Sequence, residues 1–305
     1  MRLTPSSIDD LGKSLASANA SKARVESCDL SAINRVLEHT PEDMTVTVEG
    51  GATLATLQAE VKKRGQWLPL DPPDSNVTIQ QLLATNVSGP RRFGYGTVRD
   101  YVIGMSVVLA DGRLIHSGGK VVKNVAGYDL MKLFIGDQGT LGIVVEVTFK
   151  LRPLPEIERV FKKSCATIID AQKLIDSVLN SPLTPTIFDL HNSGGLNVII
   201  GFDGARDEVD WQTARAAELG FTEATTLDYD KEFHQQPGAR KLSVIPTKLA
   251  EAIKAIGNNA FVARAGNGVI YYRGNEVSWP SAPIPKHLQQ RVKKTFDPNH
   301  ILPEL

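Results

Sequence analysis

The chain has 305 residues, of which 42% are hydrophobic and 22% are charged, an ordinary composition for a globular protein of one or two domains. Lys plus Arg and Asp plus Glu each number 34, so no basic surplus favours a nucleic-acid partner. The first residues lack a signal-peptide pattern, and the longest apolar run, residues 102–110, is too short to span a membrane. We therefore expect a cytoplasmic protein with no transmembrane segment and no nucleic-acid partner.

The first half of the chain alternates between helical and extended patterns. A capping box at Ser7 and Asp10 precedes apolar residues at helical spacing. An Asp111-Gly112 pair between two apolar runs is typical of a type I′ hairpin turn. In chain order we predict a helix over 8–18, a strand over 44–49, a helix over 54–65, a loop over 67–76, a hairpin over 101–117, a helix over 126–134 capped by Gly136, and a strand over 143–151.

After Pro153 and Pro155 the pattern changes, and we place a domain boundary near Leu154. The elements that follow have the βαββαβ order of a ferredoxin-like unit. They are a strand over 158–164, a helix over 167–180, strands over 186–191 and 197–203, a helix over 206–219 and a strand over 222–227. A weaker strand, helix and strand pair lie between 241 and 274, and a last helix is expected near 284–296.

Metal, hydrolase and nucleotide motifs are absent from the sequence. Cys28 and Cys165 are far apart in the chain, and the six histidines show no pairing at helical spacing, so we expect no metal site. No GxSxG or GxxxxGK[ST] pattern occurs, and the glycines at 136, 139 and 142 lie between a helix and a strand, the reverse of a Rossmann turn.

Four loops of small residues remain, at 71–74, 84–89, 93–96 and 137–143. Backbone N–H groups with Ser and Thr hydroxyls can hold a pyrophosphate without a cluster of cations, and small side chains let the backbone approach it. By composition these loops are candidates for a cofactor cradle.

A long series of motifs closely resembles the FAD-binding PCMH-type (vanillyl-alcohol oxidase / p-cresol methylhydroxylase) family, and within it the E-subunit branch of the bacterial glycolate oxidases. The motifs are TVTVEGGATLATLQ, WLPLDPP, LLATNVSGPRRFGYGTVRDYVIG and GGKVVKNVAGYDLMKLFIGDQGTLGIVVEVTFKLRPLPE. The resemblance is dense over residues 44–156 and thin elsewhere.

The resemblance implies an α+β fold: a PCMH-type FAD-binding domain of two α+β subdomains over 1–154, then an α+β cap over 155–305. It implies non-covalent FAD and a set of flavin-lining residues. These are Pro72, Pro73, Asp74, Ala84, Thr85, Asn86, Ser88, Gly139, Thr140, Leu141, Gly142 and Ile143. Lys123, Asn124, Gly127 and Tyr128 match a hallmark of the E-subunit branch to which we assign no contact.

The resemblance also implies a small 2-hydroxy acid as substrate, a second flavin subunit and an iron–sulfur subunit. A substrate carboxylate would need a guanidinium, for which Arg91, Arg92, Arg240 and Arg264 are candidates, although loop arginines more often form structural ion pairs. We assign no catalytic residue from the sequence.

Two departures from the family pattern leave two hypotheses open. The Gly-rich phosphate loop expected before Asp29 is missing, and the family's Gly pair after Thr78-Ile79 is replaced by Gln80-Gln81. If positions 80 and 81 require positive φ, each non-glycine residue costs on the order of 1 kcal/mol. The chain is either an FAD-binding oxidoreductase subunit or a flavin-free structural subunit that keeps the fold.

Overall fold

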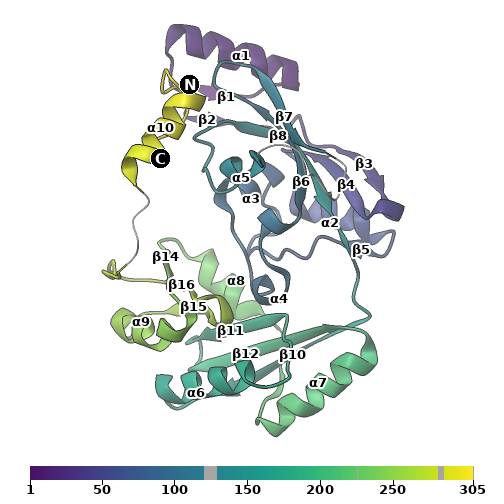
Figure 1. The fold of residues 1–305 in the computed structure, drawn as a ribbon, viewed down its shortest axis with the longest axis vertical. Helices are drawn as coiled ribbons and strands as arrows, with labels where there is room; N and C mark the ends of the chain where they lie inside the picture. The colour runs from purple at the N-terminus through teal and green to yellow at the C-terminus, as the bar shows by residue number, and fades with distance from the viewer. Residues whose placement is uncertain (120–128, 225, 281–284, 305) are drawn as a thin grey trace.

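The computed structural model describes residues 1–119, 129–224, 226–280 and 285–304, which form two lobes stacked along the long axis of the molecule (Figure 1). The first lobe contains the N-terminal half of the chain and the last helix. The second lobe is built from residues 157–280. No helix among the described residues has the length and apolar character needed to cross a membrane.

The first lobe is centred on a five-stranded antiparallel sheet in the order β3-β4-β8-β6-β7. Its strands are β3 (Val36–Thr40), β4 (Thr45–Glu49), β8 (Ile143–Lys150), β6 (Val102–Val108) and β7 (Leu114–Gly118). Two short pairs flank it, the parallel β1 (Arg2–Leu3) with β2 (Ser27–Cys28) and the antiparallel β5 (Gln66–Trp67) with β9 (Arg152–Pro153). The predicted strands over 44–49 and 143–151 correspond to β4 and β8.

Helices cover the first sheet at positions that the sequence signals explain. They are α1 (Ile8–Ser21), α2 (Leu54–Lys62), α3 (Ile79–Thr85), α4 (Arg92–Tyr95) and α5 (Met131–Phe134), with 3₁₀ turns η1 (Pro41–Asp43) and η2 (Val98–Asp100). The Ser7 hydroxyl accepts from the Asp10 amide and caps α1, as predicted. Helix α3 was not predicted, although Thr78 and Gln81 form a capping box at its start.

Two predictions in this lobe need correction. The hairpin between β6 and β7 exists, but of the two predicted turn residues only Gly112 has positive φ, whereas a type I′ turn needs positive φ at both. The second concerns the helix predicted over 126–134: among the described residues it begins at Met131, so the prediction is wrong for residues 129 and 130. Residues 126–128 lie outside the described ranges, as do the hallmark residues 123, 124, 127 and 128.

The second lobe has one seven-stranded sheet in the order β13-β10-β12-β11-β15-β16-β14. Its elements are β10 (Ile157–Ser164), α6 (Ile168–Leu179), β11 (Ile187–His191), β12 (Asn197–Gly204), α7 (Arg206–Glu218), β13 (Thr222–Ala224), α8 (Asp228–Gln235), β14 (Arg240–Ser243), η3 (Pro246–Lys248), α9 (Leu249–Ile256), β15 (Phe261–Arg264), η4 (Ala265–Asn267) and β16 (Val269–Tyr272). Helices α6, α7 and α9 share one apolar core with the sheet, and α8 packs against its other face. The strands of the ferredoxin-like unit predicted over 158–227 and those predicted between 241 and 274 therefore form a single sheet.

The chain returns to the first lobe at its C-terminal end. Helix α10 (Lys286–Phe296) lies beside α1 and the N-terminus rather than on the second lobe (Figure 1). The Val25 amide donates to the Ile301 carbonyl at 2.7 Å, and Ile301 and Leu302 are buried in the same apolar cluster as Leu11 and other residues of α1. Residues from both ends of the chain thus complete one core.

Candidate functional site

Two segments predicted to line a flavin nucleotide meet at the C-terminal end of α3. The Gly136 amide donates to the Leu83 carbonyl at 2.8 Å, and the Gln138 amide donates to the Ala84 carbonyl at 2.9 Å. Asn86, which caps the helix with φ of 47°, has a buried side-chain oxygen with no hydrogen-bond partner in the described parts of the chain. An unpaired buried acceptor is costly in a folded protein, so this position suits a ligand that donates a hydrogen bond.

Asp137 organises the loop that carries Gly139, Thr140 and Leu141. Its carboxylate accepts from the Gly139 amide at 3.0 Å and from the Leu141 amide at 3.1 Å. Burial raises the pKa of Asp137 to about 6, against the lowering effect of these two hydrogen bonds. The two amides are therefore bonded to the chain's own carboxylate.

The end of this loop is fixed by tight packing. A Cβ on Gly142 would lie 2.7 Å from Cγ1 of Val107, so only glycine fits against β6 at this point. Leu141 and Ile143 on either side are buried in the two apolar clusters of the first lobe. Residues 141–143 thus hold the loop on the sheet.

A buried lysine that the sequence did not single out supports the same loop from α10. The Lys293 ammonium donates to the Thr140 carbonyl at 2.9 Å and pairs with Asp297 at 2.7 Å. It also donates to the carbonyls of Leu302 and Pro303 at 3.3 and 2.8 Å. The helical spacing of Lys293 and Asp297 was the available signal, but i, i+4 charge pairs are usually exposed.

The N-terminal end of α3 has a different character. Its first three amides are already paired: Ile79 with the Ala52 carbonyl at 2.8 Å, Gln80 with the Gly50 carbonyl at 2.8 Å, and Gln81 with the Thr78 hydroxyl at 3.2 Å. Gln80 and Gln81 are helical and do not have positive φ, so the backbone cost considered from the sequence does not arise. The replacement of the glycine pair therefore affects the site through the two glutamine side chains, at a helix end whose first amides are already hydrogen-bonded.

A pocket of about 590 Å³ lies at this end of the helix, where the sequence lacks the Gly-rich loop. It is lined by Arg2, Ser27, Cys28, Asp29, Leu30, Ser31, Asn34, Gly51, Thr53, Thr78, Gln80 and Gln81. Hydrogen bonds from the Ser31 backbone and side chain, and from Arg2, hold the pKa of Asp29 below its usual range. The lining cation, Arg2, is paired with Asp29 at 3.0 Å, which leaves no free positive charge among the lining residues for a pyrophosphate.

Two contacts narrow the space between the ends of α3. A Cβ on Gly51 would lie 1.9 Å from the Leu30 carbonyl oxygen, so the short segment before β3 sits directly on the Gly50-Gly51 turn. The Gln80 side chain extends toward the loop of residues 137–141, since a Cβ on Gly139 would lie 4.0 Å from its Nε2. The chain itself therefore narrows the expected cradle beside the pocket at the N-terminal end of α3.

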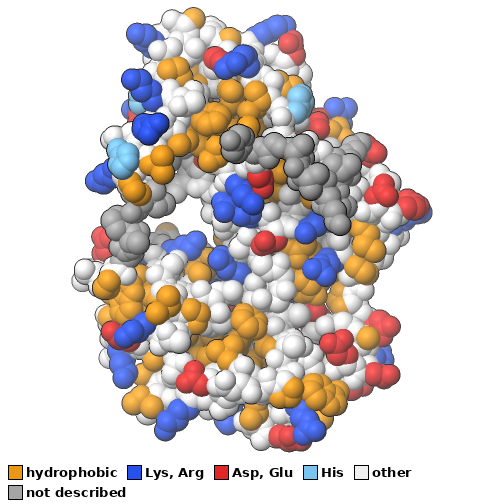
Figure 2. Space-filling model, viewed as in Figure 1, with side chains coloured by type: hydrophobic (Ala, Val, Ile, Leu, Met, Phe, Trp, Pro, Cys, Tyr) orange, Lys and Arg blue, Asp and Glu red, His pale blue; other side chains and the backbone are white. Residues whose placement is uncertain are grey.

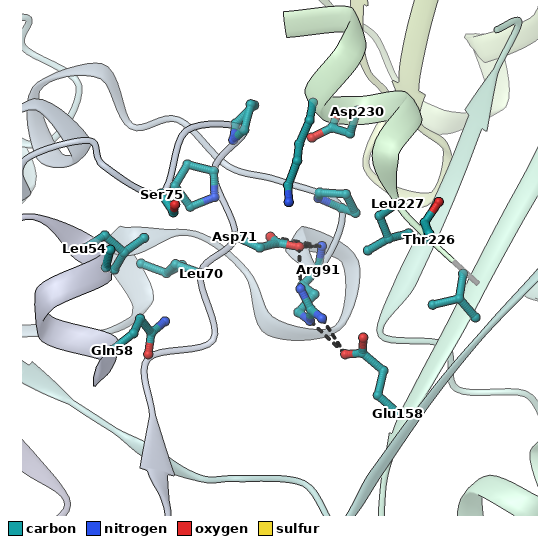
Figure 3. A pocket seen from close by; sticks show the side chains of 16 residues that line it. Leu54, Gln58, Leu70, Asp71, Ser75, Arg91, Glu158, Thr226, Leu227 and Asp230 are labelled. Atoms are coloured by element: carbon teal, nitrogen blue, oxygen red, sulfur yellow. Dashed lines mark hydrogen bonds and ion pairs between the residues drawn. The ribbon is translucent and has the colours of Figure 1, made fainter. Parts of the chain in front are cut away.

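A second pocket, of about 430 Å³, opens between the two lobes (Figure 3). Pro72 and Pro73 line it together with apolar residues of both lobes, including Leu54, Leu70 and Leu227. Along its wall, as Figure 3 shows, Arg91 pairs with Asp71 at 2.9 Å and with Glu158 of β10 at 2.5 Å. Burial raises the pKa of Asp71 to about 7, and the guanidinium of Arg91 opposes that shift. The triad joins the two lobes.

The remaining predicted residues fall in different surroundings. Asp74 is exposed, and its carboxylate accepts from the Asn76 amide at 2.8 Å. Thr85 is exposed and donates back to the Gln81 carbonyl at 2.7 Å. Ser88 is buried, and its hydroxyl accepts from Arg92 at 3.0 Å. The structure therefore groups Ala84, Asn86 and the 139–143 loop, places Pro72 and Pro73 in the interlobe pocket, and leaves Asp74 and Thr85 facing outward.

An ionic cluster is buried in the second lobe beneath the interlobe pocket. Arg264 pairs with Asp189 at 2.5 Å and with Asp230 at 2.7 Å, and the Tyr229 hydroxyl donates to Asp189 at 2.7 Å. His191 stacks on Tyr229, and burial lowers its pKa to about 4. Because both Arg91 and Arg264 are held by carboxylates, neither guanidinium is free to receive a substrate carboxylate.

The residues present fit one half of an FAD site. The C-terminal end of α3 offers small residues, a fixed glycine loop and an unpaired buried acceptor. The N-terminal end offers paired amides, two glutamine side chains and an ionised aspartate, none of which suits a pyrophosphate.

Comparison with known proteins finds similarity in both sequence and fold. Residues 12–118 match the profile of a family described as an FAD binding domain, which includes α3 but ends before the 136–143 loop. The solved structure of an alkyldihydroxyacetonephosphate synthase superposes on all of the chain and 77% of that protein, with a TM-score of 0.76 and 16% identity, so it shows the fold alone.

Curated relatives are similar over about half of the chain. Glycolate oxidase subunit GlcD of Bacillus subtilis is 38% identical over 168 residues, 55% of this chain and 36% of that protein. Glycolate oxidase subunit GlcE of Escherichia coli is 37% identical over 122 residues, 39% of this chain and 35% of that protein. A D-lactate dehydrogenase of Anaerostipes hadrus is 36% identical over 153 residues, 50% of this chain and 31% of that protein. The matched part thus spans about a third of each relative.

Proposed function

We propose that the chain, whose residues 12–118 match the profile of an FAD binding domain, is a subunit of a flavin-dependent oxidoreductase of the glycolate-oxidase type, acting on a small 2-hydroxy acid. The observation that carries the proposal is the junction of residues 84–86 with the 136–143 loop. Small residues, the fixed loop and the unpaired oxygen of Asn86 lie together there. Fold alone would not suffice for this inference, since one fold hosts many activities.

In this proposal Ala84, Asn86, Ser88 and residues 139–143 hold FAD non-covalently, and Pro72, Pro73, Asp74 and Thr85 border it. When bound, FAD supplies the two-electron oxidation of the 2-hydroxy acid to a 2-oxo acid. The protein's part is to fix the loop, through Asp137 and Lys293. No residue is assigned to proton transfer.

Electrons would then pass to partner subunits. The chain has two cysteines, one in each lobe, whereas an iron–sulfur cluster is usually held by four. We propose a second flavin subunit and an iron–sulfur subunit as partners, in the cytoplasm. The similarity to GlcD and GlcE, two subunits of glycolate oxidase, supports this part of the proposal.

We further propose that the chain divides near Leu154 into an FAD-binding domain over 1–154 and a cap over 155–305 with a ferredoxin-like unit. The order β10, α6, β11, β12, α7, β13 and the antiparallel neighbours β13-β10-β12-β11 support the cap assignment. Residues 286–304 pack on the first lobe, so the cap as a packing unit ends before α10.

The second candidate function is a flavin-free structural subunit of such a complex. The chemistry of the N-terminal half of the cradle favours it: the first three α3 amides are paired, Gln80 reaches toward the 137–141 loop, and the pKa of Asp29 is held below its usual range. In that case the interlobe surface and the partners would remain while the redox step would belong to another subunit.

The visible absorption spectrum of the purified chain, before and after incubation with excess FAD, separates the two candidates. A ligand that binds the native state must stabilise it, so the oxidoreductase proposal expects flavin absorbance that stays with the protein and a Tm that rises with FAD concentration. A colourless protein whose Tm does not change with FAD concentration would refute the oxidoreductase proposal and favour the structural subunit.

A further inference from the structure

Arg92 differs from the other arginines at the lobe boundary. Arg91 and Arg264 are each held by two carboxylates. The printed partner of the Arg92 guanidinium is the neutral hydroxyl of Ser88, at 3.0 Å, and no carboxylate of the described residues lies within ion-pair distance of it. Arg92 is half-buried, so its charge is only partly compensated by water.

A second cation lies beside Arg92, on the opposite lobe. Lys241 of β14 is the register partner of Tyr271 in β16, and cross-strand partners project from the same face of a sheet. Burial raises the pKa of Tyr271, and the guanidinium of Arg92 and the side chain of Ser88, which contacts Arg92, oppose that shift. Two residues of the first lobe and two of the second therefore lie close together.

The electrostatics of Lys241 agree with this placement. Partial burial lowers its pKa, and the Arg92 guanidinium lowers it further. No carboxylate of the described residues forms an ion pair with Lys241, and its side chain still reaches solvent. On the face shown in Figure 2, Lys and Arg side chains gather along the boundary between the lobes, where the surface is hollowed.

The short helix α4 holds Arg92 rigidly at this boundary. The Gly94 amide donates to the Thr186 carbonyl of the second lobe at 3.0 Å. The Phe93 ring packs edge-on against Phe188 at 5.4 Å, and the Tyr95 hydroxyl donates to Asp203 at 2.5 Å. Three successive residues after Arg92 are thus anchored in the second lobe, which limits the directions its guanidinium can take.

We propose that Arg92 and Lys241, with the hydroxyls of Ser88 and Tyr271, form an anion site between the lobes that binds the carboxylate of the small 2-hydroxy acid. The choice of a carboxylate rests on the proposed function. Two adjacent uncompensated cations repel each other, and an anion between them converts that repulsion into two charge-assisted hydrogen bonds. A guanidinium matches the two oxygens of a carboxylate, and an ammonium adds a point charge.

The position suits a substrate as well as an ion. Ser88 belongs to the loop that carries Asn86, so the site adjoins the junction proposed to hold the flavin. Tyr271 also packs against the buried cluster, with Arg264 5.6 Å from its ring centre and His234 4.9 Å away. The anion site thus lies between the proposed flavin junction and the charged core of the second lobe.

The test is a titration of the full chain with glycolate at constant ionic strength, followed by calorimetry and by Tm, with neutral glycolamide as the matched probe. We expect saturable glycolate binding that Arg92→Gln and Lys241→Gln each weaken about tenfold or more, equivalent to 1.4 kcal/mol. Arg92→Lys should retain more affinity than Arg92→Gln. Glycolamide should neither bind nor raise the Tm.

Arg240→Gln is the control variant, because Arg240 precedes Lys241 on the same strand, faces the opposite side of the sheet and donates to the Gly274 carbonyl. It should leave glycolate affinity unchanged within about twofold. The proposal is overturned if glycolate does not bind saturably, if glycolamide binds equally, or if Arg240→Gln weakens binding as much as the other two variants do.

Circular dichroism melts of each variant establish that it is folded before binding is measured. The titration needs no flavin, so its outcome is separate from that of the absorption test. Glycolate binding by a chain that takes up no FAD would support the anion site and refute the oxidoreductase proposal. Tight FAD binding without saturable glycolate binding would refute the anion site alone.

Discussion

The two ends of helix α3 lie only about two turns apart, yet they present opposite chemistry. The C-terminal end joins a glycine loop held by Asp137 and Lys293, and it leaves the oxygen of Asn86 unpaired. At the N-terminal end the first three amides are already hydrogen-bonded, two to carbonyls and one to the Thr78 hydroxyl, and the side chains of Gln80 and Gln81 line the pocket. The family profile covers both ends of the helix and stops before the glycine loop. A match in sequence therefore does not by itself show that both ends suit a pyrophosphate.

The largest effect should follow from removing the support of the glycine loop. Lys293→Met deletes a buried ammonium that serves Asp297 and three carbonyls, and it leaves the Asp297 charge uncompensated. We expect a loss of about 3 to 5 kcal/mol in the free energy of unfolding, measured by denaturant titration. The neighbouring Lys294→Met, on the exposed side of α10, should change it by less than about 0.5 kcal/mol. Equal effects of the two variants would contradict the role of Lys293 in supporting the glycine loop.

The titration of Asp137 gives the next effect, of about 2 kcal/mol. Its pKa is raised by burial from 3.8 to about 6, so the folded chain binds a proton that the unfolded chain has already lost in this range. The stability that this group contributes is therefore present near pH 4 and declines as the pH rises toward 6. Asp137→Asn cannot titrate, so the wild type should lose stability relative to this variant between pH 4 and 7. Parallel stability curves for the two proteins would contradict the assignment.

Gln80→Ala probes whether the occupied end of α3 is what weakens flavin binding. The side chain reaches toward Gly139, between the two ends of the helix, and alanine removes it without leaving the helical conformation. We expect FAD affinity to rise about tenfold, or 1.4 kcal/mol, as read from flavin fluorescence quenching on titration. An unchanged affinity would mean that the Gln80 side chain does not obstruct FAD, and that the hydrogen-bonded α3 amides or Asp29 limit FAD affinity instead.

Gln81→Ala should give the smallest effect. Its side chain accepts from the Thr78 amide and completes the capping box, which is worth about 0.5 to 1 kcal/mol. The capping box holds it at the start of the helix rather than toward Gly139, so FAD affinity should not change. If this variant alters flavin binding as much as Gln80→Ala does, the two glutamines cannot be distinguished in the way the structure indicates.

Elements with local signals could be predicted from the sequence. The cap of α1, the strands β4 and β8, and the helices and strands of the second lobe other than α8 were marked by periodicity, capping residues or glycine turns, whereas no helix was predicted over Asp228–Gln235. Helix α3 was missed because its seven residues are followed at once by the small-residue loop, which dominated the pattern. The merging of all second-lobe strands into one sheet depends on pairings such as β11 with β15, distant in the chain, that no local signal carries.

The candidate site was partly readable for the same reason. The loops at 84–88 and 137–143 could be identified by their small residues, but their meeting through Gln138 and Ala84 could not. Lys293 was not singled out in the sequence, and Arg92 was one of four candidate arginines that the sequence did not rank. Burial and hydrogen-bond partners distinguish the two residues in the structure. Lys293 is buried with Asp297, whereas Arg92 lies beside Lys241 and its guanidinium donates to a hydroxyl.

The return of α10 to the first lobe has a consequence for how the protein is made. A ribosome releases residues 286–304 after all of the second lobe, and domains tend to fold as they emerge. The glycine loop of the first lobe must therefore wait for Lys293, with its Thr140 carbonyl lacking the buried ammonium until then. A ligand that depends on this loop therefore meets the fully supported loop only after α10 has been synthesised.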